Sequence, residues 1–295
     1  MTEHIELAWD TRCATGEGVL WDAARRRVMF CDIPAGRLFA LAPETGARTT
    51  WDLRDGADPA IVGSFGLCRS GRLVVALRHR VVLWDPETAR MQDLTPAVDE
   101  PPTNRFNDGK VGPDGAFWVG SMDTRKPREA TGALYRVTAD GRVERKSDGY
   151  FVSNGLAWSP DGRTMYHSDS TPGHVDAWDF DPATGRISGR RRFATLREED
   201  GRPDGAATDA EGCYWSAGVS AGCLNRFSPE GRLLQKVSMP VPSPTMPCFA
   251  EGWLYATSLR EGKDAETLAQ APESGGLHRM PAPVAGCPIG LFADS

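Results

Sequence analysis

The chain has 295 residues, of which 40% are hydrophobic and 25% are charged, proportions that are ordinary for a soluble globular protein. Its formal net charge of -6 at pH 7 argues against a nucleic-acid partner, which usually needs a basic face. No run of 18 apolar residues could span a membrane, and the N-terminus lacks the basic start and apolar core of a signal peptide.

Seven cysteines are scattered along the chain without a Cys-x-x-Cys pair. An odd number at such spacings favours free thiols in a reducing compartment over a disulfide framework or a cysteine zinc site. We therefore expect a cytoplasmic protein, monomeric or weakly self-associating, with no membrane or nucleic-acid partner.

A hairpin pattern recurs along the chain: a glycine, a short apolar strand, a polar turn and a second apolar strand. In chain order, these hairpins are expected at 16–32, 66–77, 109–120, 155–166, 205–216 and, more weakly, 248–256. Further apolar segments, such as 38–46 and 178–185, lie between them. Each unit therefore holds about four strands, and the starts of the units are 43 to 50 residues apart.

Four antiparallel strands in this length are typical of a propeller blade. The sequence thus predicts an all-β fold, a six-bladed β-propeller that forms a single domain over residues 1–295. A stack of βαβ units would need helical periodicity between the strands, and little is present. Only the segment 264–270 could form a short helical turn.

Polar residues occupy one position in four of the six units, at the entry to the first strand. They are Glu17, the pair Asn107 and Asp108, Asn154 and Asp204. Any single Asn-Gly or Asp-Gly pair is explained as a turn. Since the innermost strand of each blade lines the central channel, however, we expect these side chains to face one axis.

Several oxygen-bearing side chains around one axis would repel each other without a positive charge between them. Carboxylate and amide ligands without His or Cys suit Ca²⁺, Mg²⁺ or Mn²⁺ better than a structural zinc. We expect one divalent ion, with Ca²⁺ as first choice and Mg²⁺, Mn²⁺, Zn²⁺ or Fe²⁺ as alternatives. The chain has no Gly-x-Ser-x-Gly nucleophile elbow, which argues against a serine hydrolase.

The chain resembles the gluconolactonase/regucalcin (senescence marker protein) family. The similarity runs from about residue 13 to residue 280, and it rests on the strings at 16–22, 104–110, 153–158, 166–170 and 203–205. The resemblance implies lactone hydrolysis and, as in animal members, calcium binding. It also implies that Glu17, Asn154 and Asp204 bind the metal.

The same resemblance assigns substrate and metal-water contacts to Arg105 and Asn107, with Asp108 beside them. The chain departs from the family in the stretch 123–131, where some relatives place a substrate-contacting Glu and this chain has Thr or Arg. Asp123 is the candidate substitute. The preferred sugar therefore stays open.

The resulting hypothesis is a metal-dependent hydrolase that opens sugar-acid lactones such as glucono-, xylono- or arabinonolactone. Asp204, with an ordinary pKa of about 4, would be the general base, and Arg105 and Asn107 would hold sugar hydroxyls or the developing oxyanion. One alternative is a non-catalytic calcium-binding regulatory protein of the regucalcin type. Another is a scaffold like the tryptophan–aspartate repeat proteins, but the Trp-Asp pairs of this chain do not fall at a fixed repeat position.

Overall fold

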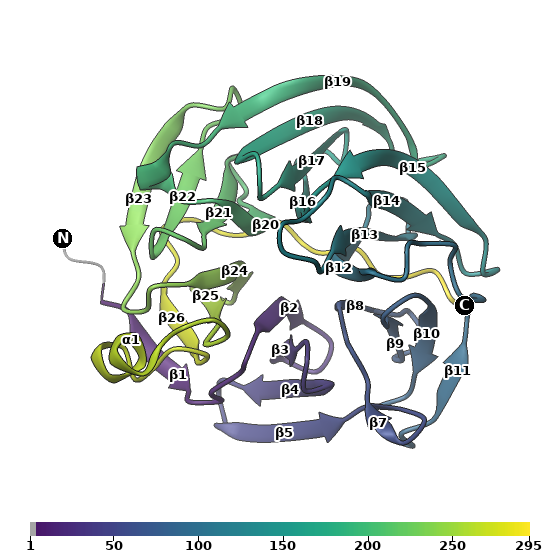
Figure 1. The fold of residues 1–295 in the computed structure, drawn as a ribbon, viewed down its shortest axis with the longest axis horizontal. Coiled ribbons are helices and arrows are strands. Elements are labelled where there is room, and N and C mark those ends of the chain that lie inside the picture. Colours follow the sequence, from purple (N-terminus) through teal and green to yellow (C-terminus); the bar gives the residue numbers. More distant parts are fainter. Residues whose placement is uncertain (1–3) are drawn as a thin grey trace.

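A computed structural model describes residues 4–295 of the chain, and strands dominate this range. Six four-stranded antiparallel sheets follow one another around a common centre, each with its first strand innermost (Figure 1). The predicted six-bladed β-propeller is confirmed.

The sheets are numbered as blades in chain order. From the inside outwards, blade 1 contains β2 (Gly16–Asp22), β3 (Arg27–Asp32), β4 (Arg37–Ala42) and β5 (Ala47–Asp52). Blade 2 contains β8 (Ser64–Leu67), β9 (Leu73–Ala76), β10 (Val81–Trp84) and β11 (Met91–Asp93). Blade 3 contains β12 (Asn104–Val111), β13 (Phe117–Asp123), β14 (Gly132–Val137) and β15 (Val143–Tyr150). A small hairpin of β6 (Arg54–Asp55) and β7 (Asp58–Pro59) links blades 1 and 2.

Blades 4 to 6 complete the ring. Blade 4 contains β16 (Ser153–Trp158), β17 (Thr164–Asp169), β18 (His174–Asp181) and β19 (Arg186–Thr195). Blade 5 contains β20 (Pro203–Thr208), β21 (Tyr214–Gly218), β22 (Cys223–Phe227) and β23 (Leu233–Ser238). Blade 6 contains β24 (Pro244–Ala250), β25 (Trp253–Ser258), β26 (Leu277–Pro281) and β1 (Glu6–Trp9). The N-terminal strand β1 is therefore the outer strand of the last blade, and this pairing closes the ring.

Apolar side chains fill the spaces between neighbouring blades in six clusters. Between blades 3 and 4, for example, Trp118 meets Trp158 and Phe180 in edge-to-face contacts with ring centroids 6.3 and 5.5 Å away. Each sheet is covered on both faces, so strands such as β9 and β10 are buried throughout. This explains the continuous apolar runs in the sequence.

The C-terminal segment 282–295 crosses the ring from blade 6 to blades 2 and 3 (yellow in Figure 1). On the way, the Cys287 N–H donates to Thr208 O at 3.0 Å and the Phe292 N–H donates to Leu67 O at 2.8 Å. Ile289 and Gly290 line a cavity of about 320 Å³ together with Lys110 of β12. The C-terminal segment thus borders the central channel beside Lys110.

The structure refines several of the sequence-based elements, and five innermost strands begin before their predicted starts. The innermost strand of blade 6 begins at Pro244, four residues before the predicted start at Cys248. The predicted helical turn is present as α1 (Ala265–Gln270), which the Asp264 side chain caps by accepting from the Thr267 N–H at 2.8 Å. A short 3₁₀ turn, Glu198–Asp200, precedes blade 5.

All seven cysteines are free thiols, as predicted. Within residues 4–295, no helix has the length and apolar character needed to cross a membrane.

Candidate functional site

The polar residues predicted to face the channel all lie on innermost strands. They are buried, and they come from four blades: Glu17 on β2, Asn107 and Asp108 on β12, Asn154 on β16 and Asp204 on β20. In the ring, β12 contacts β2 and β16, and β16 contacts β20 (Figure 1). The fold therefore assembles these side chains from positions nearly 190 residues apart in the sequence.

The innermost strands are irregular at these residues. Pairing with the next strand shifts directly after Glu17 and directly after Asn154. The following glycines, Gly18 and Gly155, have φ values of 63° and 64°, a left-handed conformation that is costly for residues with a Cβ. An irregularity of this kind bends a strand and re-aims its side chains. The Glu-Gly and Asn-Gly pairs therefore belong to bulges rather than to hairpin turns.

Three of the buried side chains are carboxylates that repel one another. Burial raises the pKa of Glu17 well above its usual range, and the charges of Asp204 and Asp108 raise it further. Burial, followed by the charge of Asp108, raises the pKa of Asp204 to about 7. The protein groups alone therefore raise the Asp204 pKa above the ordinary value of about 4 that the sequence-based hypothesis used. Glu17 and Asp204 each influence the pKa of the other.

The donor set fits a hard divalent cation. Asp108 Oδ1 is buried and has no hydrogen-bond partner among residues 4–295, and positive charge next to such carboxylates would lower their pKa values. In the described part of the chain, no three His, Cys, Asp or Glu side chains gather as a metal-binding group by themselves. A third protein ligand would therefore be the amide oxygen of Asn154, an oxygen donor of the kind that Ca²⁺ accepts.

A chain of hydrogen bonds fixes the orientation of that amide. The Ser170 hydroxyl donates its single hydrogen to Pro203 O at 2.6 Å, so its oxygen accepts from Asn154 Nδ2 at 2.8 Å. Asn154 Oδ1 then points the other way and accepts from Asn107 Nδ2 at 3.0 Å. Asn107 Oδ1 in turn accepts from an Arg105 guanidinium N–H at 2.8 Å. This series of hydrogen bonds runs from Arg105 on blade 3 through blade 4 to Pro203, the residue before Asp204.

Arg105 is the first donor in this series of hydrogen bonds and is half-buried. One of its terminal nitrogens donates both to Asn107 Oδ1 and to Phe106 O, the latter at 2.9 Å. Burial lowers its pKa to about 10, although the negative charges of Glu261 and Glu17 oppose that change. The remaining guanidinium N–H groups are not engaged by these two bonds, so they can donate to a bound molecule.

Two functional candidates were not identified from sequence. Ser170 closes the string 166–170 that carries the family resemblance, but that string gives no sign of a contact with Pro203. Lys110 directly follows the Asn107-Asp108-Gly109 string, and its ammonium donates to Ala206 O of blade 5 at 2.6 Å. Its positive charge is the largest influence opposing the burial that raises the Asp108 pKa. The adjacent Asp-Gly-Lys string was the available signal for Lys110.

The Asp123 side chain bonds to its own loop and not to these channel residues. It ends β13, and its two carboxylate oxygens accept from Arg125 Nε at 3.0 Å each. Oδ2 also accepts from the Glu129 N–H at 2.7 Å. These bonds hold the loop 124–131, and the hydrogen bond from Arg125 is the main reason that the Asp123 pKa is lowered. Contact between Asp123 and a substrate stays a prediction.

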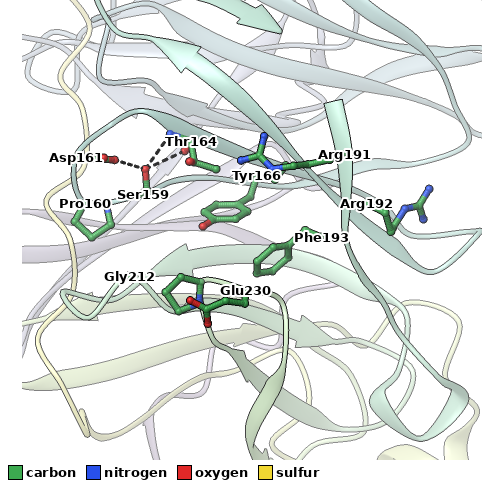
Figure 2. A pocket seen from close by; sticks show the side chains of 12 residues that line it. Ser159, Pro160, Asp161, Thr164, Tyr166, Arg191, Arg192, Phe193, Gly212 and Glu230 are labelled. Atoms are coloured by element: carbon green, nitrogen blue, oxygen red, sulfur yellow. Dashed lines mark hydrogen bonds between the residues drawn. The ribbon is translucent and has the colours of Figure 1, made fainter. Parts of the chain in front are cut away.

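A different cavity, of about 520 Å³, lies between blades 4 and 5 (Figure 2). Ser159 and Pro160, which line it, follow the last residue of β16, whereas Asn154 lies near the start of that strand. Tyr166 and Phe193 form its aromatic wall (Figure 2). None of the predicted site residues lines this cavity, and the channel group is therefore the candidate site.

Known proteins resemble the chain over nearly its whole length. It is 40% identical over 300 residues to 6-deoxy-6-sulfogluconolactonase from Pseudomonas putida, covering 99% of this chain and 100% of the relative. It is 36% identical to regucalcin from Bos taurus over 94% of this chain and 93% of that protein. Among solved structures, a calcium-binding regucalcin from Agrobacterium tumefaciens superposes with a TM-score of 0.90 at 25% identity, covering 98% of this chain and 97% of the other.

The sequence-family model for the SMP-30/gluconolactonase/LRE-like region matches residues 15–260 of this chain. This range includes the strands that carry Glu17, Asn107, Asn154 and Asp204. The chain belongs to the SMP-30/gluconolactonase/LRE-like family.

Proposed function

We propose that this protein is a metal-dependent lactonase that hydrolyses sugar-acid lactones, such as glucono-, xylono- or arabinonolactone, to the aldonic acids. The observation that carries the proposal is the hydrogen-bonded chain from Arg105 through Asn107 and Asn154 to Pro203, beside buried Asp204. The relative that is 40% identical is named a lactonase, which supports the same reaction class.

Glu17, Asn154 and Asp204 would hold the divalent ion through their side-chain oxygens. Ca²⁺ is the first choice because the ligands are all oxygens and a similar solved structure is titled a calcium-binding protein; Mg²⁺, Mn²⁺, Zn²⁺ and Fe²⁺ are the alternatives. When bound, the cation would polarise the lactone carbonyl and favour ionisation of a water molecule.

The chain's own residues would move the protons. Asp204 would accept a proton from the water whose oxygen attacks the carbonyl carbon. The ring C–O bond then breaks, and the proton passes from Asp204 to the departing ring oxygen, which becomes the hydroxyl of the aldonic acid. The neighbouring cation would keep Asp204 ionised, which is the form that accepts a proton.

Other residues would orient the lactone. Arg105 would donate its free N–H groups to sugar hydroxyls or to the developing oxyanion, and Asn107 would hold Arg105 in place. Asp108 would accept from a substrate hydroxyl through Oδ1, since Oδ2 already accepts from the Leu156 N–H at 3.0 Å. Asp123 would act through the loop that it holds.

A second candidate function is that of a non-catalytic calcium-binding regulatory protein. The 36% identity to regucalcin favours it, because the same ligand set would bind Ca²⁺ without turnover. Lactonase activity is favoured by the donors and acceptors that remain free at the site, namely the Arg105 N–H groups and Asp108 Oδ1. The free thiols fit the cytoplasmic location that we also propose.

The test is lactone hydrolysis at neutral pH, corrected for spontaneous opening, with the purified full chain. We expect turnover that EDTA removes and that added divalent ion restores. Cation binding without turnover of any lactone would favour the regulatory protein instead. Turnover that survives thorough chelation would contradict the metal-dependent mechanism.

A further inference from the structure

The cavity between blades 4 and 5 lies at the end of the blades away from Asn154 (Figure 2). Its volume of about 520 Å³ falls within the range of ~300–1,000 Å³ that is usual for small-molecule sites. The turns that follow β16, β20 and β22 form its rim. None of the residues assigned to the channel site lines this cavity, so the lactonase proposal gives it no role.

The wall of the cavity is largely apolar. Tyr166 and Phe193 supply two aromatic rings with centroids 4.8 Å apart. At the rim, a Cβ atom on Gly212 would lie 3.5 Å from Pro229 and 3.9 Å from Pro160, so two prolines of neighbouring blades converge there. These side chains can enclose a ring or a short hydrocarbon chain.

One polar group of this wall has no partner. Tyr166 is only 3% exposed, and its hydroxyl makes no hydrogen bond within residues 4–295. In Figure 2 the hydroxyl oxygen points into the cavity, on the side of Pro160. Buried tyrosine hydroxyls usually have a hydrogen-bond partner, and a molecule in the cavity would supply it.

The arginines that line the cavity are already paired. Arg191 Nη1 lies 2.7 Å from Asp179 Oδ1, and Arg192 Nε lies 2.8 Å from Asp176 Oδ1. The Arg192 guanidinium also points away from Tyr166 in Figure 2. Neither aspartate lines the cavity, so the negative charge that balances these arginines lies outside it.

The acidic residues that line the cavity have no ion-pair partner. In the part of the chain that the structure describes, no Lys, Arg or His nitrogen lies within 4.0 Å of a carboxylate oxygen of Asp161 or Glu230. Asp161 Oδ1 accepts from the Ser159 hydroxyl at 2.6 Å, and this bond is the main reason that the Asp161 pKa is lowered. Two unpaired carboxylates beside aromatic rings attract a cation.

We propose that this cavity binds a small primary ammonium ion with an aryl-alkyl body, at a site separate from the lactone site. The hydrocarbon part packs on Tyr166 and Phe193, and the ammonium donates to the carboxylates of Asp161 and Glu230. The Tyr166 oxygen accepts from the same ammonium, since a hydroxyl oxygen accepts as well as donates. The faces of the aromatic rings add a further attraction to the cation.

The test measures the binding of 2-phenylethylammonium to the full chain by NMR titration at neutral pH. A neutral and an anionic molecule of similar size, 2-phenylethanol and 3-phenylpropionate, are titrated in the same way. We expect the amine to bind about tenfold more tightly than either of them. Equal affinity for the alcohol would overturn the selection of a cation, and tighter binding of the acid would assign the cavity to anions instead.

Two variants locate the bound amine. Tyr166→Phe keeps the ring and removes the hydroxyl, so it should raise the Kd by about tenfold, as expected for a lost hydrogen bond to a charged group. Glu230→Gln should raise the Kd by about threefold, because an exposed ion pair contributes less.

Glu87→Gln is the matched control, because both glutamates are exposed and each follows a proline in the turn between the third and fourth strands of its blade. It removes the same unit charge from blade 2 and should leave the Kd unchanged. If Glu87→Gln weakens binding as much as Glu230→Gln does, the effect is one of general surface charge, and the proposed site fails.

Amine binding that Tyr166→Phe and Glu230→Gln leave unchanged would also overturn the site. If Asp204→Ala abolishes that binding instead, the amine occupies the channel and not this cavity. Lactone turnover enters none of these measurements, so this inference and the proposed function fail separately.

Discussion

Replacing Ser170 with alanine tests whether a hydrogen bond outside the ligand set controls cation binding. The variant loses the 2.8 Å bond from Asn154 Nδ2 and the 2.6 Å bond to Pro203 O. Asn154 and Ser170 are both buried, so water does not readily replace the lost partner. Leaving a buried donor unpaired costs about 1–3 kcal/mol.

The larger effect concerns the direction of the amide. Without the hydroxyl, only the bond from Asn107 Nδ2 still distinguishes the oxygen of Asn154 from its nitrogen, so the amide is held less firmly with its oxygen towards the cation. Loss of such an outer partner weakens metal binding by about 10- to 100-fold, which corresponds to about 1.4–2.7 kcal/mol. We therefore expect Ser170→Ala to raise the Kd for Ca²⁺ and Mn²⁺ by that factor, measured by calorimetry on chelated protein.

Two variants serve as controls for this measurement. Ser170→Thr keeps the hydroxyl and should retain most of the affinity. Ser243→Ala also removes a buried hydroxyl, but one whose Oγ has no hydrogen-bond partner in the described range 4–295, and it should leave the Kd unchanged. A Ser170→Ala protein that folds normally and binds both cations within twofold of wild type would refute the role of Asn154 as an oriented ligand.

The remaining predictions concern single residues. Arg105→Ala should mainly raise KM in steady-state lactone assays, whereas Asp204→Ala should abolish turnover; a pure kcat loss in the Arg105 variant would contradict its orienting role. Burial, aided by the charges of Arg190 and His174, lowers the pKa of His167 to about 3. Below pH ~6.5, His167 therefore binds a proton in the unfolded chain but stays neutral in the folded chain. Lowering the pH from 7 to 4.5 should reduce the free energy of unfolding by about 2–3 kcal/mol through this residue. Urea titrations should show a correspondingly smaller loss of stability in His167→Gln. Lys110→Met should destabilise the fold by about 1–3 kcal/mol, because Ala206 O loses its donor and buried Asp108 loses the positive charge that most lowers its pKa. Adding Asp108→Asn should recover part of that loss in thermal unfolding, and strict additivity would show that the two residues are not coupled.

The sequence was sufficient for the architecture because each blade repeats the same local pattern. Runs such as Val81–Trp84, closed by turns at regular spacing, identify four short strands per unit without any knowledge of their partners. Ring closure was beyond this reasoning. β1 has only four residues and pairs with β26 some 270 residues later, and the repeat pattern carries no information about that partner.

The candidate site was predictable in part for the same reason. Glu17, Asn154 and Asp204 stand at equivalent positions of their repeats, so their approach to one axis follows from the symmetry of the ring. Ser170 and Lys110 act across blade boundaries, on Pro203 and Ala206, and such contacts depend on how neighbouring sheets pack. The raised pKa of Asp204 likewise arises from burial beside carboxylates of other blades, which no local string reveals.

The most direct test of the ligand set is anomalous diffraction from a crystal of the full chain soaked in Mn²⁺. We predict one strong peak in the channel, in contact with the carboxylates of Glu17 and Asp204 and with Asn154 Oδ1. A crystal of active protein without a peak there, or with its ion bound elsewhere, would contradict the account.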